Sequence, residues 1–135
     1  MTADSLLKVA RTLAVAAGGL DFATGVGLVT LPAFTLARMG APVPGEEALL
    51  YVRFVGVFVA SVGATYLGAW ALGGAARLRS VFGFTLPFRA GAGSFTGVAV
   101  AMGALGPAWL VVTATDLALA GVQSWLLAKG VGRHA

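Results

Sequence analysis

Residues 12–31 read TLAVAAGGLDFATGVGLVTL, an apolar run with a single charged side chain, that of Asp21. As an α-helix these residues rise about 30 Å, which is the thickness of the hydrocarbon core of a bilayer. Lys8 and Arg11 precede the run and Pro32 follows it. A secretory signal peptide also begins with basic residues, but here the apolar stretch before Asp21 is short and no convincing cleavage site follows. The run therefore predicts a membrane-spanning helix.

The composition of the whole chain agrees with this interpretation. Of its 135 residues, 59% are hydrophobic, 10% are charged and none is cysteine. Soluble domains contain about 45–50% apolar and about 25% charged residues, so an ordinary soluble enzyme, a disordered tail and a disulfide-stapled scaffold are excluded. The net charge of +4 comes from basic residues at the ends of apolar runs, where membrane topology places them. We therefore expect the lipid bilayer as a partner and no nucleic acid.

Three more apolar runs follow, and each is long enough to cross a bilayer. They cover about 49–72, 81–105 and 108–128. Residues 32–48 contain three of the five prolines and predict one long extracytoplasmic loop, with a short interfacial turn at about 33–39. Pro87 lies near the start of the third run, where a helix tolerates proline. The chain is thus predicted to be a single all-α membrane domain over residues 1–135, an up-down bundle of four transmembrane helices whose first span is about 12–31.

Basic residues are distributed unevenly between the predicted loops. In a four-span chain the N-terminus, the loop between the second and third spans and the C-terminus share one side of the membrane. That side carries Lys8, Arg11, Arg77, Arg79, Lys129 and Arg133, whereas the long opposite loop carries only Arg38. Lysine and arginine are enriched in cytoplasmic loops, so both termini are predicted to face the cytoplasm.

Small residues recur at four-residue spacing within the spans. The second span carries Gly56, Ala60, Ala64 and Gly68, and the third carries Gly93, Gly97 and Ala101. The first span carries Gly18 and Gly25, which flank Asp21. Lipid tails are as apolar as leucine, so helices associate in a membrane through close backbone approach and interhelical hydrogen bonds. We interpret these residues as seams, the faces along which two helices pack closely inside the bundle. The alternative is that they form homo-oligomer faces.

Four ionisable residues lie within the predicted spans. At the rise of an α-helix, Asp21 is about 15 Å and Asp116 about 18 Å from the cytoplasmic surface, and Arg89 is about 12 Å deep. The long side chain of Arg89 can therefore reach the layer of the two carboxylates. Arg53 enters its span from the other side. An unpaired charge at the centre of a spanning helix costs at least about 2.5–3.5 kcal/mol, so two aspartates and two arginines predict a neutral buried cluster.

Polar side chains share helix faces with these charges, and we predict that they meet in the interior. The predicted cluster consists of Asp21, Thr24, Arg53, Arg89, Thr113, Asp116 and Gln123. Tyr66 is interpreted as an interior hydrogen-bonding residue. Two roles for the cluster stay open. Its ion pairs could only specify which helices are neighbours, or its small-residue surroundings could form a cavity for a lipid head group, another small amphipathic molecule, a quinone or a proton.

Several chemistries lack the residues that they need. Without cysteine, thiol redox relays and thiolate metal sites are excluded. The single histidine, His134, is predicted to be solvated in a polar tail, so histidine ligation of haem or metal within the membrane has no ligands. Ser61 and Ser94 have no partner base and are interpreted as packing residues rather than nucleophiles. We predict no metal, no cofactor and no catalytic residue; any side-chain catalysis would depend on the carboxylates and arginines alone.

Each predicted span has one recognisable feature. The first contains GLDFATG at 19–25 and is closed by proline, and the second is rich in glycine from Arg53 to Gly68. The third contains a basic residue, Arg89, and the fourth an acidic residue, Asp116. This arrangement resembles the DoxX-like group of small bacterial four-span membrane proteins. The resemblance implies a multi-pass protein of the bacterial cytoplasmic (inner) membrane. Some members of that group are associated with quinone-linked redox complexes, but neither a substrate nor a catalytic residue is carried over.

The preferred hypothesis is a membrane protein whose Asp/Arg cluster lines a pocket for a small amphipathic, lipid-like or quinone-like ligand. One alternative is an accessory subunit that adds helices to a larger membrane complex. Another is a small proton-coupled transporter that acts as a homo-oligomer. A pocket beside the charges would favour the first hypothesis. A tightly packed interior with an apolar groove facing lipid would favour the second, and charges at a two-fold protomer interface would favour the third.

Overall fold

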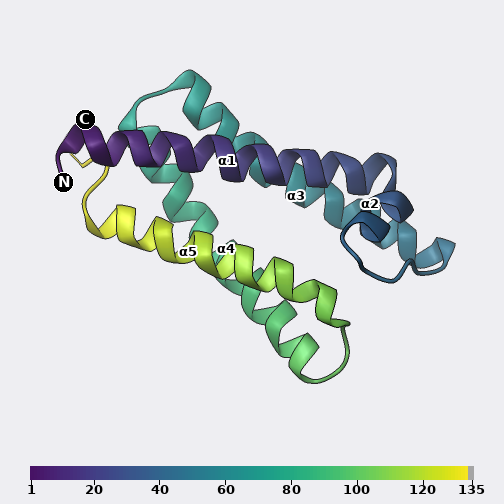
Figure 1. Cartoon of the computed structure of the whole chain (residues 1–135). Helices are drawn as coiled ribbons and strands as arrows, with labels where there is room; N and C mark the ends of the chain where they lie inside the picture. The colour runs from purple at the N-terminus through teal and green to yellow at the C-terminus, as the bar shows by residue number, and fades with distance from the viewer. Residues whose placement is uncertain (134–135) are drawn as a thin grey trace.

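The computed structural model describes residues 1–133, and every regular element in this part of the chain is helical (Figure 1). The elements are, in chain order, α1 (Ala3–Thr30), α2 (Pro32–Arg38), α3 (Glu46–Leu72), α4 (Ala75–Ala101), the 3₁₀ turn η1 (Pro107–Trp109) and α5 (Leu110–Ala128). The predicted all-α class is confirmed. The predicted tail residue His134 lies outside the described residues.

Three helical segments of the described chain are long and apolar enough to cross a membrane. They are α1, α3 and the segment Pro107–Ala128, which contains α5. This finding supports a membrane protein. Helix α4 is as long as α3, with 27 residues each, but it is more polar. Each helix has three charged residues, and α4 adds four hydroxyl side chains where α3 has two, besides Tyr51 and Tyr66.

The segment between α1 and α3 contains the short helix α2, where the sequence predicts an interfacial turn. Pro32 occupies the first position of α2, where the missing N–H of proline is tolerated. Leu36 of α2 is buried and packs with Leu28 of α1 and with Ala41. Helix α2 therefore folds back against the end of α1, and the long loop of the prediction is partly helical.

The prediction that Pro87 lies near the start of a helix is wrong. Helix α4 begins at Ala75, so Pro87 lies in its interior. A proline ring there clashes with the carbonyl group four residues earlier and removes one backbone hydrogen bond. That earlier residue is Gly83, which lies inside α4, so both effects act within the helix.

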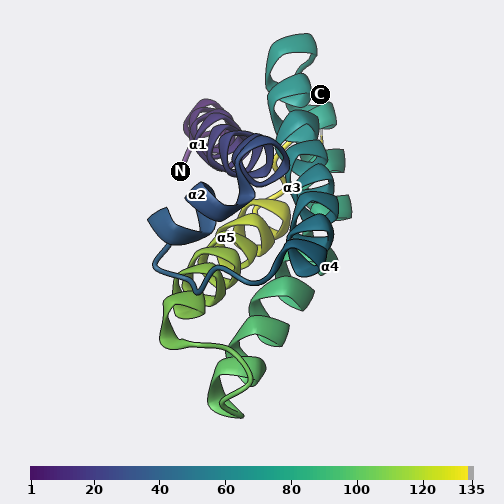
Figure 2. The ribbon, with the colours of Figure 1, turned by 90° about the vertical axis from the view of Figure 1, so that its right-hand side faces the viewer.

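The helices are arranged as two antiparallel pairs. Helix α1 packs along α3 and α4 packs along α5, whereas the two pairs contact each other much less. Figure 1 shows the pairs close together at the end that holds both chain termini and diverging toward the end that holds α2. The view turned by 90° shows the loop after α2 passing close to the start of α5 (Figure 2), where a Cβ at Gly40 would lie 3.7 Å from the Cβ of Ala108.

A shared core lies at the end of the molecule where the two pairs meet. Its buried residues come from all four long helices and from the segment after α5: Ala10, Ala14, Tyr66, Ala69, Leu78, Phe82, Leu126 and Val131. The second, smaller core lies at the α2 end, where Leu28, Leu36 and Ala41 are buried and Leu49, Val52 and Trp109 pack against them. The two pairs are therefore joined chiefly near the terminal end, with a smaller contact through Trp109 at the α2 end.

Glycines allow the close contact within the α1–α3 pair. A Cβ at Gly63 would overlap the backbone nitrogen of Phe22, and a Cβ at Gly25 would overlap the backbone of Ala60. A Cβ at Gly56 would lie 2.9 Å from the carbonyl oxygen of Gly25. Substitution at any of these glycines requires the two helices to move apart.

The predicted ladder of small residues on α3 is partly wrong. Gly56 and Ala60 face α1, but the next contact is made by Gly63, whereas Ala64 is exposed and a Cβ at Gly68 would have no neighbour within 4 Å. The reason is geometric. At about 100° per residue, positions four apart drift by about 40° around a helix at each step, so a strict four-residue ladder leaves the contact face.

The small residues predicted to lie between the third and fourth spans match the α4–α5 contact more closely. A Cβ at Gly93 would lie 2.9 Å from the side chain of Leu117, and one at Gly97 would lie 3.1 Å from that of Thr113. Both glycines thus lie in the seam, while Ala101 at the end of the predicted ladder is exposed. Gly93 and Gly97 bring the backbone of α4 close to α5, directly beside the charged residues described next.

Candidate functional site

Arg89 lies on the buried face of α4. Its neighbours on that face include Thr85, Gly93 and Thr96, which are spaced by three or four residues and therefore share one side of the helix. Only 2% of Arg89 is exposed. A guanidinium group so deeply removed from solvent needs partners for its charge and for its hydrogen-bond donors.

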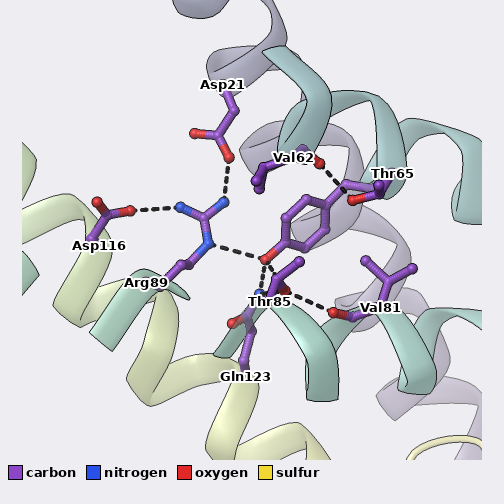
Figure 3. A network of polar contacts seen from close by, with 9 residues as sticks. Asp21, Val62, Thr65, Val81, Thr85, Arg89, Asp116 and Gln123 are labelled. Atoms are coloured by element: carbon purple, nitrogen blue, oxygen red, sulfur yellow. Dashed lines mark hydrogen bonds and ion pairs between the residues drawn. The ribbon is translucent and has the colours of Figure 1, made fainter. Parts of the chain in front are cut away.

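Two carboxylates from different helix pairs bind this guanidinium group. Arg89 Nη2 lies 2.5 Å from Asp21 Oδ2 of α1, and Arg89 Nη1 lies 2.7 Å from Asp116 Oδ1 of α5. Figure 3 shows the two carboxylates approaching Arg89 from separate sides. Hydrogen bonds of this length between charged groups are stronger than those between neutral groups. The three charges that the sequence places in one layer are thus brought together, and Arg89 joins α1 to the α4–α5 pair.

The remaining guanidinium nitrogen contacts the fourth long helix. Arg89 Nε donates a hydrogen bond to the hydroxyl of Tyr66 on α3, at 3.0 Å. The central carbon of the guanidinium also lies 5.1 Å from the centre of the Tyr66 ring, within cation–π range. Arg89 therefore makes a polar contact with each of the other three long helices.

With the Gln123 amide as the structure places it, the hydrogen bonds around Tyr66 form one consistent scheme. Thr85 Oγ1 donates to the carbonyl oxygen of Val81 at 2.7 Å, so it can only accept from Tyr66, whose hydroxyl lies 2.7 Å away. The Tyr66 oxygen then accepts from Arg89 Nε and from Gln123 Nε2. Each hydroxyl has a single hydrogen and this scheme uses each hydrogen once. The prediction that Tyr66 is an interior hydrogen-bonding residue is confirmed.

Gln123 of α5 is fully buried, and its Oε1 has no hydrogen-bond partner within residues 1–133. An unsatisfied buried acceptor costs about 1–3 kcal/mol. A hydrogen-bond donor from outside the described chain would therefore stabilise this position.

The cluster of Asp21, Arg89 and Asp116 has a formal charge of −1. In the described part of the chain, neither carboxylate pairs with any other basic side chain. The side chains of Asp21 and Asp116 are 15% and 16% exposed, and the second oxygen of each accepts no hydrogen bond from residues 1–133. The arginine is enclosed, whereas the carboxylates are accessible.

The predicted fourth charge, Arg53, does not belong to this cluster. Its guanidinium group donates to the backbone carbonyls of Val29 and Thr30 at the end of α1. The last carbonyls of a helix lack intrahelical partners, so they are ready acceptors. On α3, Arg53 precedes Tyr66 by about 20 Å along the helix axis, too far for its side chain to reach Arg89. The prediction of a neutral cluster is therefore wrong.

The two predicted threonines also lie apart from the ion pairs. Thr113 Oγ1 is 2.8 Å from Thr96 Oγ1, a hydrogen bond that joins α5 to α4 two helical turns from Arg89. Thr24 is half-buried on α1, and its side chain makes no hydrogen bond with the residues that the structure describes. Thr85 was missed by the prediction. Its position four residues before Arg89, on the same helix face, was the available signal.

Two surface hollows occur elsewhere on the described chain. One of about 380 Å³ lies between α1 and α5 and is lined by Lys8, Val9, Thr12, Leu13, Ala16 and Val122. The other, of about 390 Å³, lies at the start of α3 beside Glu46 and Tyr51. Neither is lined by Asp21, Arg89 or Asp116, so a ligand pocket at the cluster stays a prediction. Residues 1–133 contain no group of three potential metal ligands.

No protein-family model, curated protein or solved structure matches the chain. The resemblance to DoxX-like proteins therefore stays a prediction that depends on the sequence pattern alone.

Replacing Tyr66 with phenylalanine is expected to lower the free energy of unfolding by about 2 kcal/mol. The change leaves Arg89 Nε and Gln123 Nε2 without the oxygen to which they donate, and buried donors without partners are destabilising. Unfolding by sodium dodecyl sulfate in neutral detergent micelles, followed by circular dichroism, measures the loss. Tyr51→Phe is the matched control because Tyr51 is 65% exposed. Equal stability of the two variants would show that the Tyr66 hydroxyl stabilises nothing.

Proposed function

We propose that the chain is a four-span protein of the bacterial cytoplasmic membrane whose Asp21–Arg89–Asp116 cluster binds the head of a small amphipathic molecule. The molecule lies between the two helix pairs, with its apolar part in contact with helix faces or lipid. One observation carries the proposal. The two carboxylates are partly exposed within an otherwise buried polar network, and each keeps an oxygen without a hydrogen-bond partner in residues 1–133. Ionisable groups within spans commonly mark ligand or ion sites.

The proposed topology places both termini in the cytoplasm and treats α4 as the third span. Both ends of the described chain and the turn between α3 and α4 lie at the same end of the molecule (Figure 1). That end carries the excess of basic residues, which favours the cytoplasmic side. The arginines at the start of α4 can extend along the helix to the membrane surface.

The topology predicts which engineered cysteines are accessible from outside the cell. The chain has no cysteine, so a single one can be labelled without background. In intact cells a membrane-impermeant maleimide is expected to label Val43→Cys, in the α2–α3 loop, and to spare Ala76→Cys, at the start of α4. Permeabilised cells should show labelling of both. The reverse pattern in intact cells would contradict the proposed orientation.

A copurification experiment tests the ligand proposal. The chain is extracted in a mild neutral detergent and analysed by native mass spectrometry. We expect a discrete added mass of a small molecule on the unaltered chain and its loss from Asp21→Asn. Asp4→Asn is the matched control, because Asp4 is an exposed aspartate in the first turn of α1. Absence of any added mass, or the same mass on all three proteins, would contradict ligand binding at the cluster.

A second candidate function is that of an accessory subunit, and the character of α4 favours it. This helix carries three arginines, yet Phe84 and Phe95 are 84% and 71% exposed on its surface. Helices of a partner protein could cover both the polar and the aromatic positions. In the same native mass spectra this function predicts a second polypeptide of fixed stoichiometry in place of a small molecule.

A further inference from the structure

The Asp21–Arg89–Asp116 cluster lacks one positive charge. We infer that the ligand of the proposed function is a cationic amphiphile, whose ammonium head binds the free carboxylate oxygens of Asp21 and Asp116. This inference rests on the proposed function and names the chemical class of its ligand. Its first basis is the charge count. Two carboxylates share one guanidinium group, and the described chain offers neither of them a second cation.

The geometry leaves the carboxylates free on the side away from Arg89. Asp21 Oδ2 and Asp116 Oδ1 are bound by separate nitrogens of the guanidinium, so Asp21 Oδ1 and Asp116 Oδ2 remain as acceptors. A protonated amine has three N–H donors and one positive charge. Bound beside these oxygens, it brings the formal charge of the cluster to zero.

The buried Gln123 oxygen is an independent sign of a missing donor. Gln123 belongs to the same network through Tyr66 and Thr85, and Figure 3 shows its side chain directed toward Thr85. Its Oε1 is fully buried and has no donor in residues 1–133. The unpaired groups of this network, the two aspartate oxygens and the glutamine oxygen, are thus all acceptors. Such a site favours a ligand that donates hydrogen bonds.

Other head groups fit this site less well. A carboxylate or phosphate head adds negative charge to a cluster that already carries −1, and this repulsion is strong where the dielectric constant is low. Quinone carbonyls accept hydrogen bonds, whereas the open side of the cluster presents acceptors. An alcohol can donate a single hydrogen bond but brings no charge. Of these heads, the ammonium group alone supplies both a positive charge and several donors.

Three probes of equal chain length separate these possibilities. The full chain in dodecyl maltoside micelles is titrated with dodecylammonium, dodecanoate or dodecanol, and bound probe is counted by native mass spectrometry. We expect one dodecylammonium per chain, bound saturably, and affinities for the other two probes that are weaker by about tenfold or more. In Asp21→Asn and in Asp116→Asn the affinity for dodecylammonium should fall about tenfold or more, because each change makes the cluster neutral. Asp4→Asn should bind like the unaltered chain.

The outcomes distinguish the inference from the proposed function. If dodecanoate or dodecanol binds as tightly as dodecylammonium and its binding is lost in Asp21→Asn, the ligand class is wrong while the proposed site stands. If no probe saturates, or if the aspartate variants bind all probes like the unaltered chain, both fail. The ranking of the three probes on the unaltered chain decides the ligand class even where an aspartate variant does not fold.

Discussion

Replacing Arg89 with methionine is expected to lower the free energy of unfolding by about 3–5 kcal/mol. Methionine fills much of the same space, so the loss reflects charge rather than volume. Without Arg89, the carboxylates of Asp21 and Asp116 stay within the membrane with no cation from residues 1–133, and the Tyr66 hydroxyl loses one of its donors. Unfolding by sodium dodecyl sulfate in dodecyl maltoside, followed by circular dichroism, measures the difference.

Arg53→Met is the matched control for this experiment. Arg53 is exposed and donates only to two backbone carbonyls at the end of α1, so its loss is expected to cost at most about 1.5 kcal/mol. Equal losses of stability in the two variants would mean that the charge of Arg89 contributes no more than that of Arg53. The description of the cluster as the junction between the helix pairs would then be wrong.

Replacing Gly63 with leucine is expected to destabilise the protein by about 3 kcal/mol or more. Even a Cβ at this position overlaps the backbone nitrogen of Phe22, so α1 and α3 must separate to admit a larger side chain. Separation loses the dispersion contacts along the α1–α3 seam, and in a membrane these contacts are a main source of helix association. The same detergent unfolding experiment measures this loss.

Gly68→Leu tests whether the loss of stability at Gly63 comes from its position in the seam or from replacing any glycine of α3. Gly68 lies on the same helix, and a Cβ there would have no neighbour within 4 Å. Leucine also favours the helix over glycine by up to about 1 kcal/mol, so this variant is expected to be as stable as the unaltered chain or slightly more stable. A loss at Gly68 as large as that at Gly63 would contradict the assigned seam.

The sequence predicted the helices and the central ion cluster because both depend on distances along the chain. Hydropathy identifies apolar runs, and the rise of a helix gives the depth of each charge. These two quantities place Asp21, Arg89 and Asp116 in one layer, where the structure joins them. The low dielectric of the membrane interior then makes pairing the favoured outcome.

The errors concern rotation about the helix axes and angles between helices, which composition does not determine. Arg53 was grouped with the cluster because charge balance favoured it, but the carbonyls at the end of α1 lie closer. Gly68 was placed in a seam because a four-residue spacing ignores the rotation of the helix. The divergence of the two pairs depends on which small residues face each other, and a single sequence does not contain that information directly.

The stability of a charge-free cluster tests the central claim most directly. The triple variant Arg89→Met, Asp21→Asn, Asp116→Asn is compared with Arg89→Met alone in the same detergent unfolding experiment. Because removing both carboxylates removes the unpaired charges, the triple variant is expected to recover about 2 kcal/mol or more of the loss caused by Arg89→Met. A triple variant that is no more stable than Arg89→Met would show that the two aspartates do not depend on Arg89, and that something other than this ion cluster joins the helix pairs.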